Sequence, residues 1–176
     1  MSKKPENKNV QARRKGFDVQ KMTILALLVA AALMIYAIES MLPTLVPIPG
    51  IKLGLANIVV VLALYYLGPQ YALLINLIRI ALAALLFGSL FSGLYALAGG
   101  LVSLGVMVLL KKTGLFSLTA VSMAGGAFHN LAQLIVAALV ASTSDVFLYL
   151  PVLFVAGIAT GIFNGIVCTL VLRKLK

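Results

Sequence analysis

Arg79 and Lys52 are the two basic residues that stand apart from the other Lys and Arg residues of this sequence. Arg79 lies about eight residues into an apolar stretch that starts near Tyr71, and at about 1.5 Å per residue this places it near the middle of a membrane-spanning helix. A charged side chain at that depth costs at least about 2.5–3.5 kcal/mol, so it indicates a functional site. A guanidinium there needs a carboxylate, several carbonyl groups or a bound anion, and the sequence leaves all three open. Asn76, one helical turn earlier, lies on the same helix face.

A second polar group lies in the apolar stretch from residue 118 to residue 141. His129 and Gln133 are spaced i, i+4, and Asn130 and Gln133 are spaced i, i+3, so a helix presents all three over a narrow arc. A single histidine with no suitable cysteine or carboxylate partners does not favour a metal site. The sequence also contains no nucleophile–base–acid set and no Walker-type phosphate loop. We therefore expect a binding site here, with no metal, no cofactor and no catalytic residue.

A third set of polar residues flanks the proline-rich segment 43–50. Glu39, one turn after Tyr36, ends the first apolar stretch, and Lys52 and Asn57 follow the prolines. Glu39, Lys52 and Asn57 are expected in the outer third of the membrane and Tyr36 one turn below Glu39, and together they would line a cavity that opens outward below the proline-rich segment. The predicted ligand is small and anionic: the cations would neutralise its charge, the amides would supply hydrogen bonds, and the tyrosine would stack on a ring. The complete predicted binding set is Tyr36, Glu39, Lys52, Asn57, Asn76, Arg79, His129, Asn130 and Gln133.

Hydropathy and charge predict the elements that position these residues. The chain of 176 residues is 62% hydrophobic, yet its net charge is +10. A span takes about 20 apolar residues, so six spans use nearly the whole chain. All of the fourteen Lys and Arg residues except Lys52 and Arg79 then fall at one side of the membrane, which the positive-inside rule makes cytoplasmic, with both termini inside. The predicted spans are 22–42, 54–67, 71–87, 94–110, 118–141 and 147–172, and the predicted outer segments are 43–52, 88–93 and 142–145.

This assignment divides the chain into a basic cytoplasmic tail, residues 1–21, and one membrane domain, residues 22–176. No folded basic surface remains that would suit a nucleic acid. Ala26 and Ala30 in the first span are spaced i, i+4, as are small residues in the sixth, and such faces let helices approach closely in lipid. Two interpretations are open for them, namely packing inside the bundle and docking of a partner membrane protein.

The stretch from Pro49 to Asn57 reads PGIKLGLAN. It resembles a motif of the Gx transporter family, whose members are often labelled heptaprenyl diphosphate synthase component I. Segments 97–103, 126–133 and 149–151 are similar to further blocks of that family, and the resemblance extends over residues 22–172. The family in turn resembles the substrate-binding S components of energy-coupling factor (ECF) transporters. The resemblance implies an all-α bundle of six transmembrane helices in a prokaryotic plasma membrane.

The same resemblance implies a role in transport. An S component binds a vitamin-like molecule in an outward cavity, and Ala26 and Ala30 match the small residues with which it docks onto a membrane scaffold subunit that is coupled to two ATPase subunits. A flavin-type molecule is the first expectation for the ligand. The alternative interpretation is a membrane accessory of polyprenyl diphosphate synthesis, which would bind a lipid diphosphate with the same cations and dock onto a soluble synthase. A third interpretation is a structural module in which Arg79 only braces the bundle.

Overall fold

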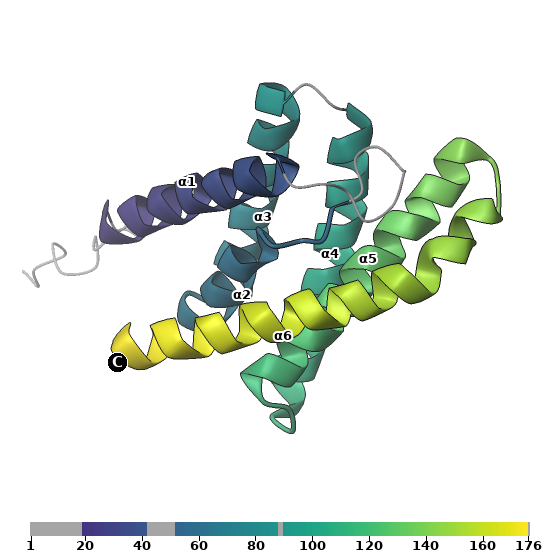
Figure 1. The fold of residues 1–176 in the computed structure, drawn as a ribbon. Coiled ribbons are helices and arrows are strands. Elements are labelled where there is room, and N and C mark those ends of the chain that lie inside the picture. Colours follow the sequence, from purple (N-terminus) through teal and green to yellow (C-terminus); the bar gives the residue numbers. More distant parts are fainter. Residues whose placement is uncertain (1–18, 42–51, 88–89, 176) are drawn as a thin grey trace, which may run out of the picture.

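The computed structural model describes residues 19–41, 52–87 and 90–175, and within them every regular element is a helix (Figure 1). The elements in chain order are α1 (Val19–Met41), α2 (Asn57–Tyr66), α3 (Pro69–Phe87), α4 (Leu90–Thr113), α5 (Leu118–Ala141), the 3-10 helix η2 (Asp145–Tyr149) and α6 (Leu150–Leu175). The all-α class predicted from the sequence is confirmed for this part of the chain. The predicted tail up to residue 18 and the whole proline-rich segment 43–50 lie outside the described residues.

Five of the helical segments in the described part of the chain are long and apolar enough to cross a membrane. They are α1, α3, α4, α5, and η2 together with α6. The exception is α2, whose 10 residues extend only about 15 Å at 1.5 Å per residue, whereas the hydrocarbon core is about 30 Å thick. The protein is therefore a multi-pass helical membrane protein by length and composition. The predicted sixth span, and with it the orientation of the two termini, stays a prediction.

Of two predicted outer turns, one differs from the structure and the other agrees with it. The outer turn expected over residues 88–93 is wrong from Leu90 onward, because α4 begins there and continues through Gly93. The glycines had indicated a turn, but a glycine inside an apolar helix is tolerated where neighbouring helices pack against it. The turn after α5 lies where it was expected: Ser142 adopts a left-handed conformation (φ 51°) and ends the helix, and η2 then leads into α6.

The short helix α2 forms the centre of the bundle. Val60, Ala63 and Leu64 are fully buried, and α2 contacts α1, α3, α4 and α6. Valine and leucine on every side suit a helix that is enclosed by other helices. Because the surrounding helices cover it, α2 does not need to reach both surfaces of the bilayer. Its first residue, Asn57, is buried and contacts Ser103 of α4.

Helices α5 and α6 lie side by side along most of their length, as Figure 1 shows, and they share the most extensive contact in the described structure. Glycines make this contact possible. A Cβ on Gly157 or Gly161 would collide with the backbone of α5 at Gly126 and Met123, so the two helices touch backbone to backbone. For the small residues of α6 the structure therefore shows packing inside the bundle.

Candidate anion-binding site

The site forms where the chain leaves regular structure just before α2. Residues Lys52 to Ala56 are not helical, and Gly54 has a positive φ of 83°, a conformation that favours glycine. Non-helical backbone at membrane depth is tolerated only where protein surrounds it and satisfies its polar groups. Side chains from three helices do this here. The Gly54 N–H donates to Glu39 Oε1 at 2.7 Å, and the Lys52 N–H donates to Gln133 Oε1 at 3.2 Å.

On the other side of this segment, α6 supplies a hydrogen-bond donor. Asn164 Nδ2 donates to the carbonyl of Gly54 at 3.4 Å and joins α6 to the non-helical segment. Thr160 Oγ1 lies 3.3 Å from the carbonyl of Leu53, but its single hydrogen has closer acceptors in the carbonyls of Ala156 and Gly157, at 3.0 and 3.1 Å. The segment Lys52–Ala56, which we call the stapled segment, is thus held by α1, α5 and α6 together.

Beneath the stapled segment lies a small polar cavity of about 10 Å³. That is about the smallest volume that accommodates one water molecule. The residues that line it come from α1, the stapled segment, α3, α4 and α5, and they are Tyr36, Glu39, Lys52, Gly54, Ala56, Arg79, Ser92, Ala96, His129 and Gln133. Six of the nine predicted binding residues are therefore brought together around one cavity.

Arg79 is the buried cation of this cluster. Its side chain is only 5% exposed, and its Nε and Nη2 atoms donate to Asn76 Oδ1 at 3.1 and 2.8 Å. Glu39 lines the same cavity, yet in the described part of the chain no ion pair joins it to Arg79. An amide oxygen satisfies part of the guanidinium without neutralising its charge. Of the partners that the sequence left open, the carboxylate is therefore not paired with Arg79, and the positive charge adjoins the cavity.

The second cation, Lys52, covers the cavity from the stapled segment. Its ammonium nitrogen lies 3.4 Å from the centre of the Tyr36 ring, which is a close cation–π contact. The phenol oxygen of Tyr36 is 3.1 Å from Ser92 Oγ, and its ring contacts Phe87 at 5.2 Å between centroids. Tyr36 is thereby fixed from both ends. Lys52 is consequently positioned by an aromatic face, with its charge unpaired by a carboxylate among the described residues.

His129 and Gln133 contribute the amide and imidazole groups of the cavity wall. Gln133 Nε2 and His129 Nε2 are 2.9 Å apart, which joins the pair predicted from the i, i+4 spacing. Their side chains fit because glycines face them: a Cβ on Gly99 would lie 2.9 Å from the His129 ring, and one on Gly54 would lie 3.0 Å from it. Within the described residues, the buried His129 Nδ1 has no hydrogen-bond partner.

Three predicted residues do not line the cavity. Asn76 accepts hydrogen bonds from Arg79 and positions it. Gly100 leaves room for the Asn76 side chain, because a Cβ at that position would lie 2.6 Å from the Asn76 amide nitrogen. Asn57 donates to Ser103 Oγ at 2.9 Å and joins α2 to α4. Asn130 faces α6, where its Nδ2 donates to the carbonyl of Leu153 at 2.7 Å. The last two therefore connect helices in this structure.

Four cavity residues were not predicted: Gly54, Ala56, Ser92 and Ala96. Ser92 was missed because residues 88–93 were expected to be an outer turn, whereas they include the first turn of α4. The signal that would have identified Ser92 is its spacing, one turn before Ala96 and two turns before Gly99–Gly100, on a single small and polar face.

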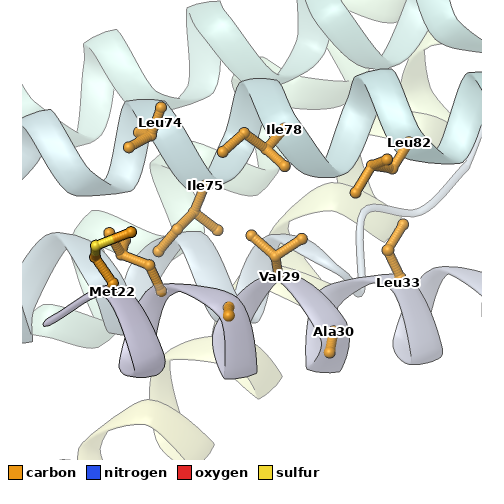
Figure 2. A pocket seen from close by; sticks show the side chains of 10 residues that line it. Met22, Val29, Ala30, Leu33, Leu74, Ile75, Ile78 and Leu82 are labelled. Atoms are coloured by element: carbon orange, nitrogen blue, oxygen red, sulfur yellow. The ribbon is translucent and has the colours of Figure 1, made fainter. Parts of the chain in front are cut away.

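The predicted docking residues Ala26 and Ala30 lie on the exposed side of α1. Both line an apolar groove between α1 and α3, which Figure 2 shows from close by. Their exposure makes them accessible from outside the bundle.

The fold and the site together define a helical membrane protein that encloses two cations beside a small polar cavity. The chain belongs to the family described as heptaprenyl diphosphate synthase component I, which matches residues 28–171. This confirms the family label that the PGIKLGLAN segment indicated. No match was found among the curated proteins or among the solved structures.

Proposed function

We propose that this protein is a non-catalytic membrane subunit that binds the diphosphate group of a polyprenyl lipid in the cluster around Arg79 and Lys52. The observation that carries the proposal is the buried guanidinium of Arg79, which adjoins a polar cavity and forms no ion pair with the one carboxylate nearby. A buried cation that is not directly paired with a carboxylate among the described residues attracts an anion. The name of the family supports a prenyl diphosphate as that anion.

The distribution of acidic residues supports binding without catalysis. The whole sequence contains four Asp and Glu residues, and Asp-rich motifs that would hold magnesium ions are absent. Prenyl-transfer chemistry on diphosphates depends on such ions, so we assign it to a soluble partner synthase. The role proposed for this chain is to hold the lipid substrate or product at the membrane for that partner.

Binding requires the stapled segment to move. A cavity of about 10 Å³ accommodates about one water molecule and no diphosphate. The side-chain hydrogen bonds that Gln133 and Asn164 make to the segment are 3.2 and 3.4 Å long, at and beyond the long end of the usual range. Only the bond from Gly54 to Glu39, at 2.7 Å, is short. We infer that the segment lifts away from α5 and α6 and pivots on Glu39.

The test is diphosphate binding to the purified protein in lipid nanodiscs. We expect both isopentenyl diphosphate and heptaprenyl diphosphate to bind. Arg79→Gln and Lys52→Gln should each lower the affinity for both ligands at least about tenfold, which is about 1.4 kcal/mol. Lys112→Gln, which changes an exposed lysine at the far end of α4, is the matched control and should leave binding unchanged. Equal binding by the Arg79 and Lys52 variants would remove the cluster as the binding site.

A second candidate function is the substrate-binding subunit of an ECF-type transporter, and one observation favours it. The cavity lies at the start of α2, whereas Lys111, in the last turn of α4, donates from Nζ to the carbonyl of Leu64 near the end of α2, at 2.7 Å. The cavity and the basic helix ends thus lie at opposite ends of α2. If the basic ends are cytoplasmic, the site faces outward, as uptake requires.

Copurified small molecules separate the two candidates. Protein extracted under mild conditions and analysed by mass spectrometry and visible absorption should carry an isoprenoid under the first proposal. A flavin or another vitamin-like anion, together with copurification of a membrane scaffold subunit and two ATPase subunits, would establish the second.

A further inference from the structure

A long apolar groove lies between α1 and α3, open on one side (Figure 2). Its volume is about 530 Å³, within the range of about 300–1,000 Å³ that is typical of small-molecule sites. Val29 and Ile75, both buried, lie in its interior, while Ala26 and Ala30 are exposed. The lining residues are Met22, Leu25, Ala26, Val29, Ala30, Leu33, Leu74, Ile75, Ile78 and Leu82, and none of them is polar.

The groove runs toward the polar cavity. In Figure 2, Met22 lies opposite Leu74 and Leu33 lies opposite Leu82, so α1 and α3 run in the same direction along it. Leu33 is one helical turn from Tyr36 and packs against the small cluster that contains it. On α3, the groove residue Ile75 is spaced i, i+4 from Arg79, which places both on one face. On α1 the groove therefore ends at Leu33, one helical turn from the Tyr36 ring that Lys52 contacts, and on α3 its residues Ile78 and Leu82 lie before and after Arg79 in the chain.

We propose that this groove holds the isoprenoid chain of the lipid whose diphosphate binds in the cavity. The inference rests on the proposed function and adds where the chain lies. A molecule with an anionic head and a long apolar chain matches both parts: a cavity lined by two cations, and an apolar groove between α1 and α3, the helices that carry Tyr36 and Arg79. The open side of the groove lets such a lipid arrive from within the bilayer, without crossing the stapled segment.

The groove contributes selectivity for the chain more than overall affinity. A hydrocarbon chain that moves from bilayer to groove leaves one apolar environment for another, so the hydrophobic effect does not drive the transfer. The fit between the lipid chain and the groove is what remains to make the protein prefer one chain over another. Ala26 and Ala30 remove side-chain bulk from the α1 wall, and the space beside them suits the methyl branches of an isoprenoid. Chain contacts then discriminate among diphosphates that the cations bind equally.

Filling the groove tests the proposal directly. We expect the double variant Ala26→Phe, Ala30→Phe to bind heptaprenyl diphosphate about tenfold more weakly than the unsubstituted protein does. Its binding of isopentenyl diphosphate should be unchanged, because that short chain does not reach the substituted positions. Leu27→Phe with Met34→Phe is the matched control, because both residues are on α1, are 65% and 62% exposed and do not line the groove. Both diphosphates should bind this control as they bind the unsubstituted protein.

Photolabelling of the unsubstituted protein gives a second measurement that does not depend on a variant folding. Heptaprenyl diphosphate with a diazirine in its chain should label peptides that contain residues 22–33 and 74–82. The groove assignment would be overturned if labelling were confined to α5 and α6. It would also be overturned if the Ala26→Phe, Ala30→Phe variant lost binding of both diphosphates to the same extent. Either result leaves the proposal for the diphosphate group standing. Failure of the unsubstituted protein to bind any diphosphate would instead refute the proposed function itself. Labelling of the groove by a phospholipid analogue at the same efficiency, or crosslinking of a partner protein there in its place, would also overturn the assignment.

Discussion

Replacing Arg79 by methionine separates binding from stability. Methionine keeps the unbranched apolar stem of the arginine and removes the charge and the donors. If the guanidinium is present to bind an anion, the change should abolish ligand binding while the protein stays folded. If Arg79 only braces the bundle, the same change should destabilise the protein strongly. The two interpretations left open by the sequence therefore predict opposite effects on stability.

The expected change in stability follows from the contacts. The substitution removes two hydrogen bonds to Asn76 Oδ1 and leaves that buried acceptor unpaired, which costs about 1–3 kcal/mol. It also removes a buried cation that no carboxylate in the described structure pairs with, and this relieves about 2.5–3.5 kcal/mol on insertion scales. The sum lies between about 0.5 kcal/mol against the variant and about 2.5 kcal/mol in its favour. Because Asn76 Nδ2 already has no partner among the described residues, the double variant Asn76→Leu, Arg79→Met should be more stable still.

The assay is reversible unfolding in mixed micelles, with binding of isopentenyl diphosphate measured on the same preparations. We expect Arg79→Met to unfold at the same or a higher denaturant concentration than the unsubstituted protein, with no measurable binding. The conservative Arg79→Lys retains charge without the planar guanidinium, and it should keep part of the binding. A loss of more than about 3 kcal/mol of stability in Arg79→Met would refute the reasoning and favour the structural role.

The remaining predictions concern the groups that hold the site in place. Gly100→Ala should disturb ligand binding, because its Cβ would lie 2.6 Å from the Asn76 amide, whereas Gly105→Ala, with open space at its Cβ, should bind normally; a titration of both variants checks this. Glu39→Ala should lower the free energy of unfolding by about 1–3 kcal/mol, because it leaves the Gly54 N–H without a hydrogen-bond acceptor. Glu39→Gln should retain most of the stability, and thermal unfolding of both variants checks this. Gly54→Ala should cost about 1–2 kcal/mol from its positive φ alone, and should speed amide hydrogen exchange in residues 52–56.

Helix-spacing arguments predicted the parts of the site that lie on a single helix. His129 with Gln133, and Asn76 with Arg79, were paired by their i, i+4 and i, i+3 spacing, and the structure joins both pairs by hydrogen bonds. Asn130 shows the limit of this reasoning. One residue is a turn of about 100° around a helix, so Asn130 faces α6, and its acceptor there is a backbone carbonyl. Spacing on one helix carries no information on which neighbour fills the other side.

The central position of α2 could not be read from the sequence for a related reason. Hydropathy identifies an apolar segment and is silent on whether lipid or protein surrounds it. The segment 54–67 was therefore predicted as a short span, and the structure makes most of it the core of the bundle. The break in the helix that the prolines predict lies mostly outside the described residues, and nothing in the sequence indicated that Glu39 and Gln133 would satisfy the backbone of Gly54 and Lys52.

The two kinds of polar residue in the cluster have different explanations. Glu39 and Gln133 accept hydrogen bonds from the stapled segment, and Asn164 donates to it, so these side chains satisfy backbone groups that a broken helix leaves open. Arg79 and Lys52 satisfy no backbone group in the described structure. Their charges add the desolvation cost of two cations without completing the fold. A polar cluster that only closed the backbone would lack both, and it is this excess of positive charge that a bound anion explains.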